Sequence, residues 1–314
     1  MSDVIAYSSA FRDDYSHRPA RLDFGVLHRS ANARGPGLCD CRPGATPEFV
    51  AHINRELGLD RPLPVQYLSW LGQMSEGSLG RSLVNRTEVT TLVANRMPVS
   101  ATIALEALVL AVLVGIPLGI IASVRAGGAI DSGIRSFTSI GIAVPEFWLA
   151  MLAVNLFALQ LFWLPPTGFT PLSAGLIPHF KSVVMPVVTL ALGPIAIIVR
   201  FTRSAMNEAL SAQYVRTAWS LGIPAHQVYL RFALKNALPS IITVIGMVAS
   251  VLIGGAVLIE SVFAIPGIGE LLVQSVLSKD FPVVQGVTTV LMFLVILINL
   301  AVDLIVAAID PRTR

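Results

Sequence analysis

Five long apolar stretches, separated by shorter polar segments, occupy the last two thirds of the 314-residue chain. A helix needs about 20 mainly apolar residues to cross the hydrocarbon core of a bilayer, and each stretch is about that long or longer. The pattern therefore predicts an all-α, polytopic membrane domain over residues 101–314. The expected spans are Thr102–Val124, Phe137–Leu164, Val183–Phe201, Ile241–Ala264 and Val283–Ala308.

Residues 46–100 carry amphipathic patterns in place of long apolar runs. Thr46 can cap a helix whose first turn holds Pro47, and apolar residues then recur at helical spacing as far as Gly58. A second amphipathic helix is predicted from Pro64 to about Gln73. We expect residues 46–100 to form an external helical segment that precedes the membrane domain.

Residues 1–45 differ from everything that follows them. They contain several arginines and no apolar run, whereas a signal peptide would need roughly 7–15 consecutive apolar residues. With little to bury, this segment is expected to be disordered. The abrupt change of composition at Thr46 also motivates the hypothesis that the start is frameshifted, misassigned or truncated.

The stretch Glu208–Pro239 lies between the third and fourth expected spans and is too polar to cross a bilayer. Short loops rich in Lys and Arg stay on the cytoplasmic side, which places this stretch, the loop Arg125–Arg135 and the C-terminus there and residues 1–100 outside. Gly222 and Pro224 predict a break between two helical pieces, because Gly can end one helix and Pro can begin the next. The basic residues in or beside the stretch are Arg200, Arg203, Arg216, Arg231 and Lys235.

Composition supports the membrane assignment and excludes several other classes of protein. The chain is 54% hydrophobic and 13% charged, with a mean hydropathy of +0.73, whereas soluble domains carry about 25% charged residues. The net charge is only +3, and no dense basic tract with interleaved aromatics points to nucleic acid.

Motifs of enzymes and metal sites are missing from the sequence. Cys39 and Cys41 are one residue apart, a poor spacing for a disulfide, and no His cluster completes a zinc site beside them. No Gly-rich phosphate loop ending in Lys-Ser or Lys-Thr is present, so we do not expect the chain to hydrolyse ATP. We therefore expect no catalytic residue, no metal ligand and no cofactor bound by this chain.

Ionisable and polar residues inside spans are costly and are candidates for function. We take five residues as candidates for a substrate pathway: Glu106, Pro145, Glu146, Asn155 and Glu260. Pro145 is expected to kink its helix. A structural role is the alternative for each acid, and Glu260 could simply reach the external interface. Asp303 could pair locally with an arginine, and Asn155 and Asn299 could form interhelical hydrogen bonds.

Four strings together resemble one family, the permease subunits of ABC importers that depend on a binding protein and carry dipeptides, oligopeptides or nickel. The resemblance covers nearly all of the chain from Thr46 onward, and it rests on the order and spacing of the strings. They are ELGLDRPLPVQYLSWLG with GSLGRSL, GIAVPEFWLAML, QYVRTAWSLGIPAHQVYLRFALKNALP and IESVFAIPGIGELLVQSVLSKDFPVVQG.

The resemblance implies a fold and a set of partners. The fold would be that of a type I ABC importer permease, here without the family's first span, and the cytoplasmic coupling loop would cover residues 202–239. The partners would be a second homologous permease, two ATP-binding subunits that hold ATP and Mg²⁺, and an extracytoplasmic solute-binding protein. The location would be the inner membrane, with the C-terminus in the cytoplasm.

The resemblance also implies which residues couple the chain to the ATPase. Where the wider superfamily has a glutamate in its coupling motif, this chain has Arg216, a departure that fits the peptide branch. The expected ATPase-coupling residues are Tyr214, Val215, Arg216, Ala218, Trp219, Leu221 and Gly222.

Three alternatives stay open. The cargo could be nickel, glutathione or another small solute carried by the same mechanism. A secondary transporter driven by an ion gradient would often show inverted repeats and broken midplane helices, and no clear repeat is visible. A membrane-embedded enzyme is disfavoured because no nucleophile, base or metal cluster assembles.

Overall fold

The computed structural model describes residues 60–309. The chain divides into two units, Met1–Gln66 and Tyr67–Arg314, and α3 (Leu63–Ser75) crosses the boundary between them, close to the helix expected at Pro64–Gln73. The expectations for residues 1–45 and for the helix beginning at Thr46 lie outside the described residues. Among the described residues the regular secondary structure is helical apart from one isolated bridge between Arg81 and Glu88, and turns and loops join the helices.

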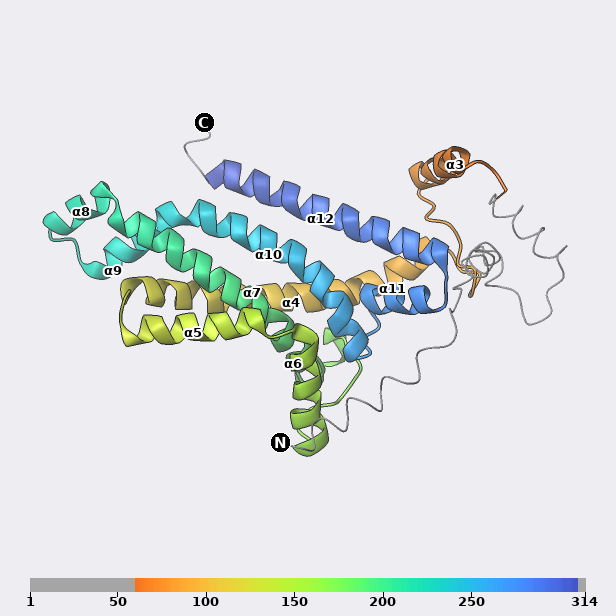
Figure 1. The fold of residues 1–314 in the computed structure, drawn as a ribbon, viewed down its shortest axis with the longest axis horizontal. Coiled ribbons are helices and arrows are strands. Elements are labelled where there is room, and N and C mark those ends of the chain that lie inside the picture. The colour runs from red at the N-terminus through yellow and green to blue at the C-terminus, as the bar shows by residue number, and fades with distance from the viewer. Residues whose placement is uncertain (1–59, 310–314) are drawn as a thin grey trace, which may run out of the picture. The chain divides into compact units, whose positions relative to one another are not determined.

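The second unit consists of long helices joined by short connections (Figure 1). Its longer helices are α4 (Val89–Val124), α5 (Ala129–Ala143), α7 (Leu176–Ser211), α10 (Lys235–Val262), α11 (Ile268–Leu277) and α12 (Phe281–Ile309). The shorter ones are α6 (Glu146–Ala153), η2 (Val154–Gln160), η3 (Leu172–Ala174), α8 (Gln213–Ser220), α9 (Ala225–Gln227) and η4 (Val228–Leu234).

Four of the expected spans are confirmed as helices long and apolar enough to cross a membrane: α4, α7, the run from α9 to α10, and α12. Several run beyond the expected limits. Helix α4 begins at Val89, well before Thr102, and α7 runs from Leu176 to Ser211 instead of Val183–Phe201. Polar residues can extend a helix at both ends of its apolar run, so apolar length alone marks the centre of a span better than its ends.

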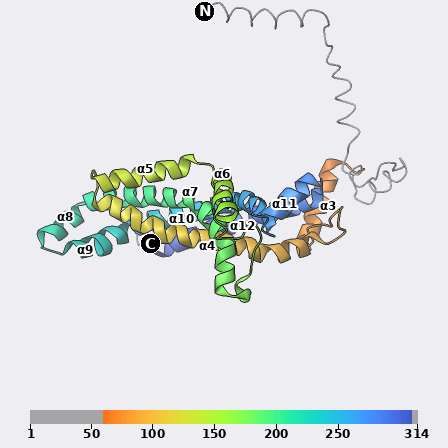
Figure 2. The same ribbon diagram turned by 90° about the horizontal axis from the view of Figure 1, so that it is seen from below.

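The fifth expected span, Phe137–Leu164, is not one straight helix. Helices α5 and α6–η2 meet at 95°, and α6 leaves the bundle crosswise in both views (Figures 1 and 2). The break falls at Val144 and Pro145, which both have extended backbone. Proline lacks the N–H that would continue the helix, and it disfavours helical dihedrals in the residue before it. The expected kink at Pro145 is therefore confirmed.

Helix α7 forms the centre of the second unit. In the most apolar 18-residue stretch of α7, 72% of the residues are buried. The corresponding share is 33% in α4 and zero in α12. Its packing against α4 depends on two glycines that let the backbones approach: a Cβ on Gly115 would lie 2.7 Å from Ile198 Cγ2, and one on Gly119 would lie 2.6 Å from Thr202 Cβ. The apolar surface of α12 is left open to lipid or to another chain.

Gly119→Ala is expected to destabilise the α4–α7 contact. Its Cβ would also lie 3.0 Å from the carbonyl oxygen of Val199, and overpacking of this kind costs about 1–3 kcal/mol. Thermal melting of the detergent-purified protein should therefore shift to lower temperature. Gly133→Ala on α5, where a Cβ meets nothing within 4 Å, should leave melting unchanged or raise it. Equal melting of both variants would contradict the close-packed contact.

Candidate functional site

Between α7 and α10 the chain forms two short helical pieces, α8 and the run α9–η4, separated by a tight turn. Gly222 has a left-handed backbone with φ of +72°, and its N–H donates to the carbonyl of Trp219 at 3.0 Å, while the N–H of Ile223 donates to Ala218 at 3.2 Å. Both bonds close the end of α8, and Pro224 precedes the first turn of α9. The break expected at Gly222 and Pro224 is confirmed.

The two faces of α8 have different surroundings. Val215 and Ala218 are buried and pack with Val228 of η4 in a small apolar cluster. This cluster holds α8 against the rest of the unit. On the other side, Trp219 is 43% and Leu221 73% exposed.

The structure thus divides the seven residues that we expected to contact an ATPase. Val215 and Ala218 face inward, and Gly222 forms the turn. Tyr214, Arg216, Trp219 and Leu221 remain exposed at the surface. Both faces of α8 carry apolar residues, so periodicity could not show which one is covered. The covered face is defined by Val228, which belongs to the second helical piece.

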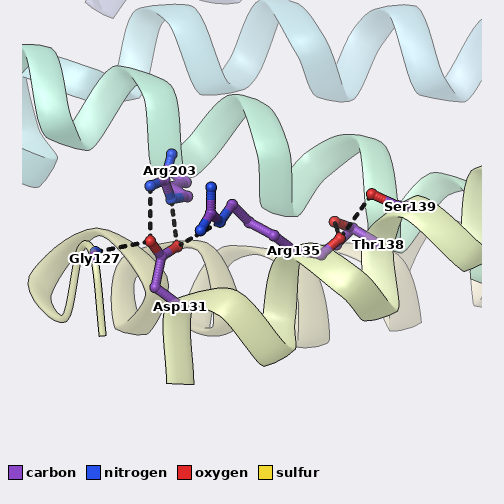
Figure 3. Close-up of polar contacts among 6 residues, drawn as sticks. All are labelled: Gly127, Asp131, Arg135, Thr138, Ser139 and Arg203. Carbon is purple, nitrogen blue, oxygen red and sulfur yellow. Dashed lines mark hydrogen bonds and ion pairs between the residues drawn. The ribbon is translucent and has the colours of Figure 1, made fainter. Parts of the chain in front are cut away.

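An ion pair between the buried Asp131 and the partly exposed Arg203 joins α5 to α7 (Figure 3). Arg203 Nε donates to Asp131 Oδ1 at 2.7 Å, and Arg203 Nη2 donates to Asp131 Oδ2 at 2.9 Å. The N–H of Gly127 donates to Oδ2 at 2.9 Å, and Arg135 Nε lies 3.7 Å from Oδ1. The sequence did not predict this pair, because each of the two segments has the composition of a basic loop. The available signal was an aspartate flanked by arginines directly ahead of an apolar run.

Glu106, the first expected pathway acid, is paired within the chain. Its Oε1 lies 2.7 Å from Nε2 of His179 on α7, and Nδ1 of the same ring lies 2.7 Å from the carbonyl oxygen of Thr170. The Glu106 side chain remains 33% exposed, so it is still accessible from one side. Sequence analysis did not single out His179, which precedes the apolar run of its helix.

Glu146, the second expected pathway acid, occupies the junction of α6, α7 and α10. A Cβ on Gly193 would lie 3.3 Å from its Oε1, and one on Gly255 would lie 2.8 Å from its Oε2. The two glycines thus make room for the carboxylate on the neighbouring helices. Among the described residues no hydrogen bond or ion pair is recorded for this carboxylate, so it differs from Glu106 in lacking a partner on its own chain.

Glu260 does not reach the external interface, in contrast to one of the alternatives above. Its side chain is fully buried, and its Oε2 accepts hydrogen bonds from the N–H groups of Gly269 at 2.7 Å and Glu270 at 3.3 Å. Ser100 Oγ accepts from the N–H of Ile268 at 2.7 Å. The first N–H groups of a helix have no partner inside it. Glu260 and Ser100 therefore cap α11 from two other helices.

Interhelical hydrogen bonds were expected for Asn155 and Asn299, and the structure shows one for Asn299. Asn299 on α12 accepts a hydrogen bond from Ser250 Oγ on α10 at 3.2 Å, which confirms the expected interhelical bond. Asn155 is exposed, and its recorded partner is Gln160 of the same helical segment at 3.5 Å, so an interhelical bond is not seen for it. Asn299, Thr243 and Asp303 line a groove of about 410 Å³ between α10 and α12. The arginines that could have paired with Asp303 lie outside the described residues.

Metal chemistry finds no support in the described residues, where no group of three or more His, Cys, Asp or Glu side chains could hold an ion. The candidate site consists of the exposed face of α8, the Asp131–Arg203 pair that joins α5 to α7, and the acids at the helix junctions further along the bundle.

Comparison with known proteins gives the chain a family. Residues 115–314 match the family model described as binding-protein-dependent transport system inner membrane component, and residues 26–105 match the model for the N-terminal part of such membrane components. The second match begins within the segment 1–45, which we had expected to be atypical.

Named relatives agree with these matches. A Brucella abortus protein whose name assigns it to a peptide transport system as a permease is 42% identical over 279 residues, 89% of each chain. The oligopeptide transport system permease protein AppB of Bacillus subtilis is 35% identical over 258 residues, 81% of this chain and 82% of that one.

Solved structures show the same all-α fold. An inward-facing structure of the MetNI methionine ABC transporter matches with a TM-score of 0.59 at 19% identity, covering 70% of this chain and 96% of the other. A crystal structure of an amino acid ABC transporter matches with a TM-score of 0.52 at 16% identity. The expected ABC permease fold is confirmed, and the chain is a membrane protein that is not itself an enzyme. It belongs to the family of binding-protein-dependent transport system inner membrane components, the permease subunits of ABC importers.

Proposed function

We propose that this permease carries dipeptides or oligopeptides, forms half of the translocation pathway with a second homologous permease, and receives its driving force from two separate ATPase subunits. Relatives named for peptide and oligopeptide transport support the cargo. The observation that carries the coupling role is α8, which is held against the bundle through Val215 and Ala218 and presents Trp219 and Leu221 outward. An exposed apolar helix face of this kind fits a groove on a partner.

The proposed orientation follows from the basic segments. Arg216 on α8, Arg231 on η4 and Lys235 at the start of α10 are basic. They support a cytoplasmic position of this end of the unit and of the C-terminus, in a cell with an inner membrane. Helix α11 and the segment ahead of α7 then face the external solute-binding protein. Protease protection and labelling of a cysteine at Arg216 from either side would test the orientation. External labelling would contradict it.

In the proposed mechanism this chain moves cargo and its partners supply the energy. ATP and Mg²⁺ bind to the ATPase subunits, and closure of those subunits displaces α8 through Tyr214, Arg216, Trp219 and Leu221. The bundle then alternates between external and cytoplasmic openings. Glu106, Pro145, Glu146 and Asn155 are our candidates for the pathway. Among them Glu146 has the strongest physical support, since its carboxylate has no recorded partner among the described residues and lies at a junction of three helices.

Reconstitution tests the function directly. The permease is purified with its co-purifying subunits, placed in proteoliposomes with ATP inside, and supplied with the binding protein and radiolabelled di- and tripeptides. Peptide uptake that requires both ATP and the binding protein is expected. Parallel arms with nickel and glutathione separate the alternative cargoes, and uptake driven by an ion gradient without ATP would contradict the importer mechanism.

Leu221→Asp is expected to separate the permease from its ATPase without unfolding it. The side chain is 73% exposed, so its replacement removes little internal packing. Loss of a hot-spot contact at the centre of an interface costs about 2 kcal/mol or more, about a 30-fold drop in affinity. Co-purification of the ATPase should fall accordingly, with thermal melting unchanged. Leu277→Asp on α11, 78% exposed, is the matched control and should keep the ATPase. Full recovery of the ATPase with Leu221→Asp would contradict docking at α8.

A further inference from the structure

Helix α7 connects the centre of the bundle to the coupling helix almost without interruption. It runs from Leu176 to Ser211, and Ala212 alone separates it from α8. The apolar cluster of Val215 and Ala218 holds α8 to this end of the unit. A displacement imposed on α8 is therefore passed directly to the last turns of α7, where Arg203 lies.

The Asp131–Arg203 pair connects those last turns to α5. Asp131 is fully buried in the first turn of α5 and receives both arms of the guanidinium, at 2.7 and 2.9 Å. A forked arginine–carboxylate contact fixes the relative orientation of two segments as well as their distance. The Gly127 N–H fixes the same carboxylate to the α4–α5 connection at 2.9 Å. Figure 3 shows the two arms of Arg203 reaching across from α7 to Asp131.

Near the other end of α5, its contact with α7 involves small groups. At Gly141 a Cβ would lie 3.4 Å from Ala196 Cβ and 3.6 Å from the carbonyl oxygen of Leu192, so the helices meet there through small apolar groups. Among the described residues, no other hydrogen bond or ion pair joins α5 to α7. Apolar contacts are not directional, so among the described residues the Asp131–Arg203 pair is the directional contact between the two helices.

The far end of α5 leads to Glu146, whose carboxylate has no partner among residues 60–309. After the bend at Pro145, α6 places Glu146 against Gly193 of α7 and Gly255 of α10. A shift of α5 along α7 would therefore move the Glu146 carboxylate relative to both glycines. Asp131 thus lies in the first turn of α5, and Glu146 lies just beyond its last turn.

We propose that Asp131 and Arg203 are positioning residues that transmit the movement of the coupling helix α8 to the α5–α6 arm and its Glu146. This inference rests on the proposed coupling role of α8. The pair touches neither nucleotide nor cargo, so its loss changes how much transport each hydrolysed ATP produces. A pair that only stabilised the fold would lower ATP hydrolysis and transport together.

The test uses the complete reconstituted importer and measures transport and ATP hydrolysis in the same proteoliposomes. Asp131→Asn and Arg203→Gln are each expected to retain assembly and unstimulated ATP hydrolysis and to lower peptide uptake about tenfold, within the range of coupling between residues in direct contact. The double variant Asp131→Asn/Arg203→Gln should transport no worse than either single variant, because the link is already broken. Arg135→Gln is the matched control: this exposed side chain is 3.7 Å from the same carboxylate, and its variant should keep uptake within about twofold.

Three outcomes would overturn the proposal: normal uptake by both single variants, multiplied losses in the double variant, or a parallel fall in ATP hydrolysis and uptake. A different result is expected if the proposed importer function itself is wrong. In that case the unmodified complex itself would show no ATP-dependent uptake with the binding protein, and the variants would have nothing to uncouple.

Discussion

Glu260→Ala is expected to lower the stability of the purified permease complex by about 3 kcal/mol, because it leaves two N–H groups at the start of α11 without an acceptor. Gly269 and Glu270 donate to this one carboxylate oxygen in a site closed to solvent. A buried donor without a partner costs about 1–3 kcal/mol, and the removed side chain also leaves a void. The measurement is thermal melting of the detergent-purified complex.

Glu260→Gln provides the matched control for that variant. The amide keeps an oxygen that can accept from Gly269 while it removes the negative charge at the helix N-terminus. Favourable interaction of a negative charge with that terminus contributes about 0.3–1 kcal/mol, or up to about 2 kcal/mol when buried, so the glutamine variant should lose clearly less stability than the alanine variant. Equal losses for the two variants would show that the charge, and not hydrogen bonding to α11, determines stability.

Much of the fold could be predicted from the apolar pattern. The centres of four spans and the break at Gly222 follow from local rules, since each depends on residues close together in the chain. The kink at Pro145 also follows from a local rule, because proline interrupts a helix. Its angle of 95° could not be predicted, because it depends on the packing of α6 against α7 and α10.

The candidate site was harder to predict for the same reason. Asp131 and Arg203 are 72 positions apart, and Glu106 and His179 are 73 apart. No periodicity links such residues, and only the packed helices bring them together. The composition of a loop showed its charge but not which charge is buried. The three acids were predicted as pathway residues because an ionisable side chain inside a membrane is costly. Each has a different environment: Glu106 is paired, Glu260 caps a helix, and Glu146 lies between glycines.

Docking of α11 against α10 also depends on the missing side chain of Gly269. A Cβ there would clash with the Cα of Val257 and lie 2.9 Å from Glu260 Oε2. A side chain could rotate away from such an overlap, whereas a backbone atom inside a long helix cannot. The helix α11 must therefore move outward as a whole, which also stretches the hydrogen bond to Glu260.

Gly269→Ala is accordingly expected to destabilise the complex by about 3 kcal/mol, at the upper end of the usual cost of overpacking. Hydrogen exchange should show the loss of protection concentrated in residues 268–277, and thermal melting should fall with it. Gly254→Ala is the matched control on α10. A Cβ there meets nothing within 4 Å, and alanine favours a helix over glycine by about 0.5–1 kcal/mol, so that variant should melt at or above the wild-type temperature. If Gly269→Ala melted like Gly254→Ala, α11 would not be packed on α10 through this contact, and the capping role of Glu260 would be contradicted as well, because the N–H of Gly269 could not then reach its carboxylate.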